Sequence, residues 1–232
     1  MTGRIGGETA MKVLVACEES QRVCTAFRER GHEAYSCDIQ KCSGGVPAWH
    51  ILMDAKAVLN GGVMRLQTGD KISIDRWDLI IARPPCTYLS NVATRHHSLN
   101  CTPPNWINAR THNRIDGMQF FMRCIEADCD KIAVENPVGI MNTAYRKPDQ
   151  IIHPYMFAES EDEEVTKGTC LWLKGLPPLL PKNATKPDNR EKYGEHPSGK
   201  AKCWEEQCGH NRSVERSKTF YGIAKAMAEQ WG

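Results

Sequence analysis

Short apolar runs alternate along the chain with segments of helical periodicity. The runs are rich in β-branched residues and bounded by polar ones, as buried strands are, and they cover residues 11–17, 32–39, 49–55, 76–86, 131–137 and 169–175. Helices are predicted over residues 18–31, where Gly31 is a suitable stop, and over 116–128 and 219–231. This alternation predicts an α/β fold with a doubly wound, mostly parallel sheet.

The pattern fades over residues 176–216, which are rich in Pro, Gly, Lys and Asn. We therefore predict three parts: a core over residues 11–175, a small loop-rich lobe over 176–216 that contacts the substrate, and a final helix over 217–232 that returns to the core. The acidic run at residues 159–165 is predicted to be a solvated loop.

Composition narrows the class of protein. A chain of 232 residues, 41% hydrophobic, suffices for one domain, or for one core with a modest lobe. The net charge of +2 neither indicates nor excludes a nucleic-acid substrate. The sequence has 11 cysteines, no apolar run of 18 residues and no signal-peptide pattern in its first ten residues, so we expect a cytoplasmic protein with free thiols and no membrane contact.

Polar residues end several predicted strands, where doubly wound sheets bind their ligands. They are Glu18, Asp38, Asp54, Cys86 and Glu135. Asp38 and Asp54 suit the ribose hydroxyls and adenine amine of a nucleoside, and the first loop lacks the GxGxxG pattern that binds phosphates. A cofactor with an adenosine and no phosphate, S-adenosylmethionine, fits best. The alternative is that both aspartates cap helices.

Cys86 and Glu135 form a second pair, in the segments PPC and VENP. Carbon 5 of a pyrimidine is a poor nucleophile until a thiolate adds to carbon 6. A partly buried glutamate that contacts the ring at N3 makes that addition easier. The two groups, about 50 residues apart at predicted strand ends, indicate carbon-5 chemistry on a pyrimidine.

These motifs resemble those of the cytosine carbon-5 DNA methyltransferases, and the chain is similar to their small phage and prophage members. The resemblance covers about residues 11–142, with a weaker match in the final helix. It implies a Rossmann-like methyltransferase fold, Cys86 as nucleophile, Glu135 at N3 and the amine, and a mobile catalytic loop over residues 87–114 that includes Arg95, His96 and His97. The implied contacts to S-adenosylmethionine are Cys17, Glu18, Ser20, Asp38, Ile39, Asp54, Ala55 and Pro84.

The chain departs from the family at three points. Its first loop, ACEESQRV, lacks glycine, and Thr166, Gly168 and Cys170 stand where the family has a Gln-x-Arg-x-Arg strand. Lys167, Arg83 or Arg95 are candidates to replace those arginines. The chain also leaves few residues for target recognition. DNA is the expected partner; single-stranded nucleic acid, a free dCMP-like nucleotide and a non-catalytic nucleic-acid-binding role remain alternatives.

Two other patterns lie in the predicted lobe. His196, Cys203, Cys208 and His210 are possible zinc ligands, although the spacing lacks a CxxC pair, and we assign no metal. Basic residues with Tyr193 and Trp204 among them form either a nucleic-acid contact surface or a solvated loop; these are Lys192, Lys200, Lys202, Arg212, Arg216 and Lys218.

Overall fold

A seven-stranded sheet forms the centre of the computed structural model, which describes residues 10–94, 103–207 and 216–232. Five neighbouring strands run parallel, and β9 runs antiparallel to both of its neighbours. Across the sheet the order is β3 (His50–Leu52), β2 (Glu33–Asp38), β1 (Lys12–Ala16), β6 (Leu79–Ala82), β7 (Ile132–Pro137), β9 (Thr169–Lys174) and β8 (Gln150–Ile152). The α/β class and the mostly parallel sheet are confirmed, and the order is compatible with a Rossmann-like fold.

Both faces of this sheet are buried, which explains why its strands read as continuous apolar runs. Successive side chains of a strand point to opposite faces. In β1, Leu14 and Ala16 belong to one hydrophobic cluster, and Val13 and Val15 belong to the other.

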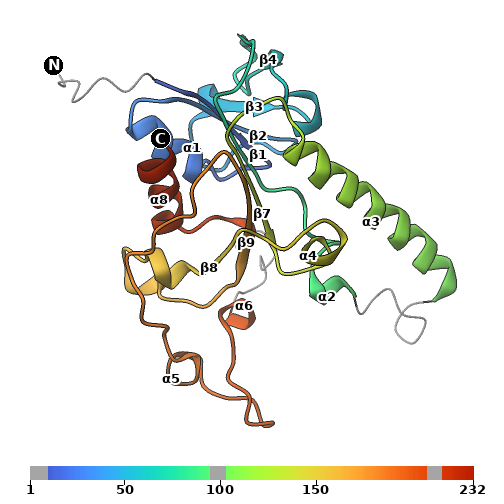
Figure 1. Cartoon of the computed structure of the whole chain (residues 1–232), viewed down its shortest axis with the longest axis vertical. Helices are drawn as coiled ribbons and strands as arrows, with labels where there is room; N and C mark the ends of the chain where they lie inside the picture. The colour runs from blue at the N-terminus through green and yellow to red at the C-terminus, as the bar shows by residue number, and fades with distance from the viewer. Residues whose placement is uncertain (1–9, 95–102, 208–215) are drawn as a thin grey trace.

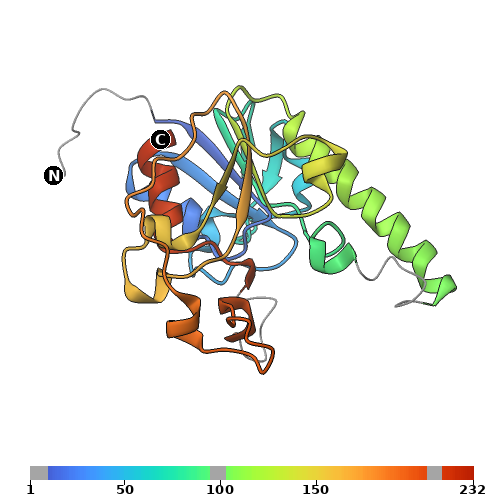
Figure 2. The same ribbon diagram turned by 60° about the horizontal axis from the view of Figure 1, so that its bottom comes forward.

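Helices cover the sheet on both sides (Figures 1 and 2). Helix α1 (Arg22–Glu29) packs beside α8 (Tyr221–Trp231), and both contribute to the cluster that contains Val13 and Val15. On the opposite face the cluster includes residues of α3 (Pro104–Ile125) and of the hairpin formed by β4 (Gly62–Arg65) and β5 (Lys71–Ile74). The sheet is therefore doubly wound, as the alternation predicts.

Short elements connect these layers. Neither the hairpin β4–β5 nor β8 was predicted, because each strand has only three or four residues and no sustained alternation. The other short elements of the described chain are α2 (Asn91–Thr94), α4 (Met141–Ala144), α5 (Asn189–Tyr193), α6 (Trp204–Gln207), η1 (Pro47–Trp49), η2 (Ala55–Ala57), η4 (Pro154–Phe157) and η5 (Glu161–Glu163).

Helix α3 is longer than predicted. Its first residue is Pro104 rather than Asp116, so the prediction that all of residues 87–114 form a loop is wrong. The outer half of the helix projects beyond the body (Figure 1), so no buried stripe marks it in the sequence. Among the described residues, no helix is both long and apolar enough to cross a membrane.

The acidic run is also not simply a solvated loop. Glu163 is only 6% exposed, and its carboxylate accepts the backbone N–H of Gly222, at 3.2 and 3.1 Å for the two oxygens. Because Gly222 lies in the first turn of α8, Glu163 supplies the acceptor and the negative charge that this helix end favours. Residues 176–207, beyond this run, are mostly irregular; their first part packs beside α8, and the part with α5 and α6 extends below the sheet in Figure 1.

Candidate active site

The carboxyl ends of β1, β6 and β7 meet at one edge of the sheet. The Arg83 N–H donates to the Ala16 carbonyl at 3.0 Å, which aligns the end of β6 with the end of β1. The chain leaves β1 toward β2 on one side, whereas β6 lies on the other, so this point is the topological switch where such sheets bind ligands. Residue Thr169, at the start of antiparallel β9, pairs with Pro137 and brings Lys167 to the same edge.

The PPC segment and the ENP segment are joined by a buried hydrogen bond. The Asn136 side-chain amide donates to the Pro84 carbonyl at 2.8 Å, and both residues are buried. Just beyond, Ser90 and Gly139 form a β-bridge, and a Cβ at Gly139 would clash with the Leu89 carbonyl. Sequence reasoning missed Asn136, although its place inside the ENP motif was a usable signal.

Cys86 is exposed at the mouth of β6, and its carbonyl accepts the N–H groups of Leu89 and Ser90 at 3.0 and 3.1 Å. The protein packed around the sulfur raises the pKa of the Cys86 thiol. The positive charges of Lys167 and Arg216 lower the pKa of this thiol, and the negative charge of Glu135 raises it further. These three charged groups therefore lie within electrostatic reach of the sulfur.

Glu135 faces Arg83 at this edge. The Arg83 Nε and Glu135 Oε2 atoms are 3.5 Å apart, and the two side chains are only 11% and 13% exposed. Arg83 also donates to the Ser217 carbonyl. Of the three candidates to replace the missing arginines, Arg83 therefore contacts the glutamate, Lys167 lies near Cys86, and Arg95 falls outside the described residues.

Three cationic side chains hold the segment that crosses this edge before α8. Lys167 donates to the Arg216 carbonyl at 2.7 Å, and Arg22 donates to the Thr219 carbonyl at 2.8 Å. With the Arg83 bond to Ser217, three separate elements fix residues 216–219 beside Cys86 and Glu135.

The two predicted adenosine ligands lie at the ends of their strands. One oxygen of each carboxylate caps local backbone: Asp38 accepts from the N–H of Gln40, and Asp54 from that of Lys56, both at 2.9 Å. The capping alternative is thus confirmed for Asp54, which caps η2, whereas Asp38 binds the backbone of a non-helical turn. Ile39, next to Asp38, is 75% exposed, whereas Ala55 is buried in η2. A contact to S-adenosylmethionine remains a prediction for all four residues.

The first loop is built without glycine. Cys17 and Gln21 both adopt left-handed backbone conformations, with φ of 62° and 59°, which side chains other than glycine rarely do. The Gln21 side-chain amide exchanges two hydrogen bonds with the backbone of Val46, at 2.9 and 3.0 Å. The loop after β2 is thus tied directly to the loop after β1.

Glu18 serves the fold in this structure. Its carboxylate is 1% exposed and accepts the N–H groups of Val23 and Cys24, at 2.8 and 3.2 Å, so it caps the start of α1. Burial raises the pKa of this carboxyl, and Arg83 opposes the rise. A direct cofactor contact through the Glu18 carboxylate, as the resemblance implies, is therefore not available in this arrangement. Ser20 is buried nearby, and its hydroxyl has no hydrogen-bond partner among the described residues.

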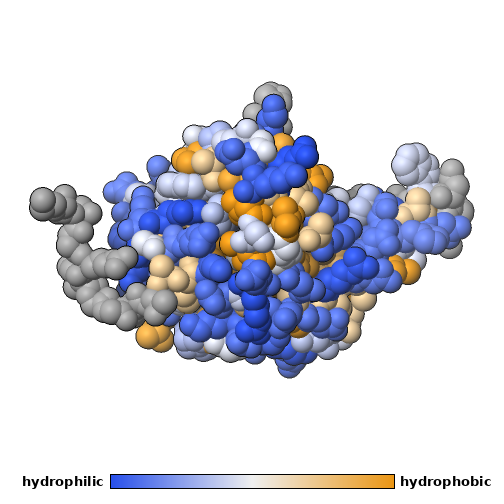
Figure 3. Space-filling view, turned by 90° about the horizontal axis from the view of Figure 1, so that it is seen from above, coloured by the Kyte–Doolittle hydropathy of each residue, from blue (hydrophilic) through white to orange (hydrophobic). Residues whose placement is uncertain are grey.

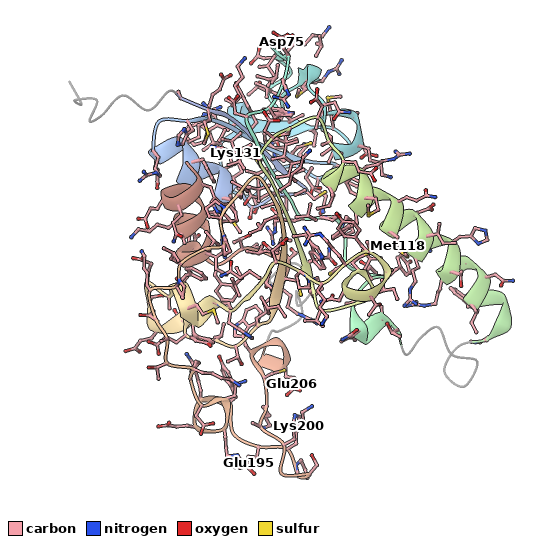
Figure 4. The ribbon with its side chains drawn as sticks, in the orientation of Figure 1. Asp75, Met118, Lys131, Glu195, Lys200 and Glu206 are labelled. Carbon is pink, nitrogen blue, oxygen red and sulfur yellow. The ribbon has the colours of Figure 1, made fainter. Side chains whose placement is uncertain are left out.

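The predicted basic surface of the lobe is partly occupied. Lys192 donates to the carbonyls of Glu161 and Glu164, at 2.7 and 3.1 Å, and Arg190 pairs with Glu195 (Figure 4 labels Glu195). Of the possible zinc ligands, His196 instead contacts Glu206 at 2.9 Å. The predicted residues outside the described ranges are Arg95, His96, His97, Cys208, His210 and Arg212.

Two surface depressions lie elsewhere. One, with a volume of about 550 Å³, follows α3 near Met118, and the other, of about 390 Å³, lies beside Tyr155 and Lys182. Neither is lined by Cys86 or Glu135. The candidate site thus rests on the chemistry and contacts of the strand ends.

No protein-family model matches the chain, and comparison with curated proteins finds no match. The functional assignment therefore depends on the residues themselves.

Proposed function

We propose that this chain transfers a methyl group from S-adenosylmethionine to carbon 5 of cytosine in DNA, as a small relative of the cytosine carbon-5 DNA methyltransferases. The observation that supports this most is the contact between the two motifs. The Asn136 amide holds the Pro84 carbonyl at 2.8 Å, which sets Glu135 and Cys86 at one sheet edge. Either tripeptide alone is weak evidence, whereas the contact between the two segments supports a role for Cys86 as a nucleophile that acts together with Glu135.

The proposed chemistry begins at the Cys86 sulfur. The thiolate forms a bond to carbon 6, and the electrons of the 5,6 double bond become available at carbon 5. Glu135, whose Oε2 lies 3.5 Å from the Arg83 Nε, donates a hydrogen bond to N3 of the ring in its protonated form and eases this addition. After carbon 5 has accepted the methyl group, water accepts the proton of carbon 5, and cleavage of the sulfur–carbon bond restores the aromatic ring and the thiolate.

The residues present fit the adenosine part of S-adenosylmethionine, which supplies the methyl group when bound. Asp38 and Asp54 offer carboxylates at neighbouring strand ends, and the exposed Ile39 side chain offers an apolar surface for the base. The buried Ser20 hydroxyl, which has no partner in the described chain, offers a further polar contact.

A free pyrimidine nucleotide is the second candidate substrate. In the described part of the lobe, Lys192 and Arg190 are occupied by carbonyls or by a carboxylate. These two cations are less available to the phosphates of a long polymer, and this favours a smaller substrate.

Methyl transfer from labelled S-adenosylmethionine tests the proposal with duplex DNA, single-stranded DNA and dCMP side by side. The Cys86→Ala variant is the control, and mass spectrometry of the nucleosides identifies the product. Label in 5-methylcytosine from duplex DNA, absent in the variant, supports the proposal. Label only in dCMP supports the second candidate. Full activity of Cys86→Ala refutes both, and DNA binding without S-adenosylmethionine binding in calorimetry indicates a non-catalytic protein.

A further inference from the structure

Two arginines of α3 lie beside the loop that carries Cys86. Arg110 and Arg114 are one helical turn apart and therefore on one face of the helix. The Arg114 Nε donates to the Tyr88 carbonyl at 3.1 Å, and the Arg110 guanidinium carbon lies 5.4 Å from the centre of the Tyr88 ring. Tyr88 is two residues from Cys86 in the chain, so both cations contact the loop that carries Cys86.

Neither arginine forms an ion pair within the described chain, in contrast to several others. Arg76, Arg83, Arg146 and Arg190 each have a carboxylate within 3.5 Å. For Arg110 and Arg114 the described contacts are the Tyr88 ring and carbonyl and the Thr94 hydroxyl, which lies 3.4 Å from Arg114. The Arg110 Nε atom is buried and has no hydrogen-bond partner there.

Such a pair is unfavourable without an anion. Each guanidinium repels the other, and burial together with Arg110 lowers the pKa of Arg114. A buried donor left without an acceptor is destabilising. A phosphate supplies both the missing charge and the missing acceptors, and guanidinium groups match its oxygens in pairs.

The surroundings leave this place open. Met118, one turn further along α3, packs against the core, whereas Trp106, one turn before Arg110, is 63% exposed. Figure 4 labels Met118, and Figure 3 shows the outer part of α3 reaching past the body with mostly hydrophilic side chains. A phosphate can therefore reach this part of α3 from the solvent side.

We infer that Arg110 and Arg114 form a phosphate-binding site for the substrate, next to the pyrimidine that faces Cys86. Naming the ligand as a substrate phosphate rests on the proposed function. The phosphate belongs either to a polynucleotide backbone or to a free nucleotide, and the two sources share the same chemistry.

The test measures binding without a methyl donor. Probes are a fluorescent single-stranded oligodeoxynucleotide and its duplex by anisotropy, and dCMP and deoxycytidine by calorimetry. The variants are Arg110→Gln and Arg114→Gln, which keep side-chain length, with Arg123→Gln as the matched control because Arg123 is exposed near the other end of α3. Thermal unfolding checks that each variant folds.

We expect each site variant to bind the oligonucleotide roughly tenfold more weakly at low salt, since a hydrogen bond to a charged group is lost. The slope of log affinity against log salt concentration should shrink by about 0.7 per arginine for single strands and about 0.9 for the duplex. The Arg123→Gln variant should match the unmodified protein. The same loss with dCMP but not with deoxycytidine assigns the site to a nucleotide's own phosphate; a loss confined to the oligonucleotide assigns it to the backbone.

Unchanged affinity and unchanged salt slope in both site variants would overturn the inference, as would equal losses in Arg123→Gln or no phosphate dependence in the unmodified protein. These results are separate from those that test the proposed function. If both arginines bind phosphate but no methyl transfer is found, this site stands and the proposed function fails. If the protein methylates its substrate and the arginine variants bind normally, the proposed function stands and this site fails.

Discussion

The two halves of the sheet edge are held in different ways. At the ends of β2 and β3, the carboxylates of Asp38 and Asp54 accept N–H groups from only two residues further along the chain, and the Gln21 side chain ties the loop after β2 across 25 positions. At the ends of β6 and β7, contacts instead join distant residues: Asn136 to Pro84 across 52 positions, and Arg83 to Ser217 across 134. Local caps can form in any loop, whereas long-range contacts hold only when the fold is assembled. The second half is therefore the one to which we assign the proposed chemistry.

The largest effect is expected from comparing two cysteines of this edge. Cys86→Ala should lower methyl transfer by more than about 10⁴-fold, because no other group replaces a covalent nucleophile. Cys17→Ala should cost far less, because Cys17 is implied only as a cofactor contact and burial raises the pKa of its half-buried thiol well above the ordinary value, whereas Cys86 is exposed. Transfer of label from S-adenosylmethionine measures both, and equal losses would contradict a special role for Cys86.

A second test breaks the contact between the PPC and ENP loops. Gly139→Ala places a Cβ against the Leu89 carbonyl, which is backbone and has no rotamer to escape into. The free energy of unfolding should fall by about 1–3 kcal/mol. Gly168→Ala is the matched control, because its Cβ would meet only the His153 ring at 3.6 Å, and its effect should stay within about 0.5 kcal/mol. Urea unfolding compares them; similar values for both variants would contradict this role of Gly139.

A third test separates capping from cofactor binding in the first half. Asp38→Asn keeps an oxygen that accepts the Gln40 N–H but loses the negative charge. We expect roughly tenfold weaker binding of S-adenosylmethionine in calorimetry, from the loss of a hydrogen bond to a charged group. The melting temperature should be unchanged. If Asp38→Asn binds S-adenosylmethionine as tightly as the unmodified protein, Asp38 does not bind the cofactor and serves only to hold the local backbone.

The smallest effect concerns pH and Glu18. Because burial raises the pKa of this carboxyl, the folded protein holds the proton more tightly than the unfolded chain. Its contribution to stability is therefore lost as pH rises from about 4.5, the ordinary value, through the raised folded pKa. Glu18→Gln costs about 1 kcal/mol of capping at low pH, and this deficit should shrink over that interval. Urea unfolding across the pH range measures it; parallel curves would contradict the raised pKa.

Sequence reasoning reached the parts of this molecule that depend on local pattern. An apolar run such as that of β1 predicts a strand whichever strands lie beside it, because both faces of the sheet are buried and the buried side chains on both faces are therefore apolar. The outer half of α3 escaped because helical periodicity appears only where a helix packs, and this half projects from the body.

The candidate site shows the same division. Cys86 and Glu135 were recognisable from their motifs, and the sheet order explains why they meet. The roles of Asn136, Arg83 and Glu163 depend on partners 52 or more residues away, and no local pattern contains those partners. Arg110 and Arg114 were hidden for another reason: residues 87–114 were expected to form a loop, where a helical spacing has no meaning.

The most direct test of the central claim is covalent trapping with DNA that contains 5-fluorocytosine. Fluorine at carbon 5 cannot leave as the proton does, so the sulfur–carbon 6 bond persists after methyl transfer. With S-adenosylmethionine present, we predict a denaturation-resistant complex of protein and DNA whose adduct maps to Cys86 by peptide mass spectrometry and is absent in Cys86→Ala. Methylation without any adduct, or an adduct that persists in Cys86→Ala, would contradict the assignment of Cys86 as the nucleophile.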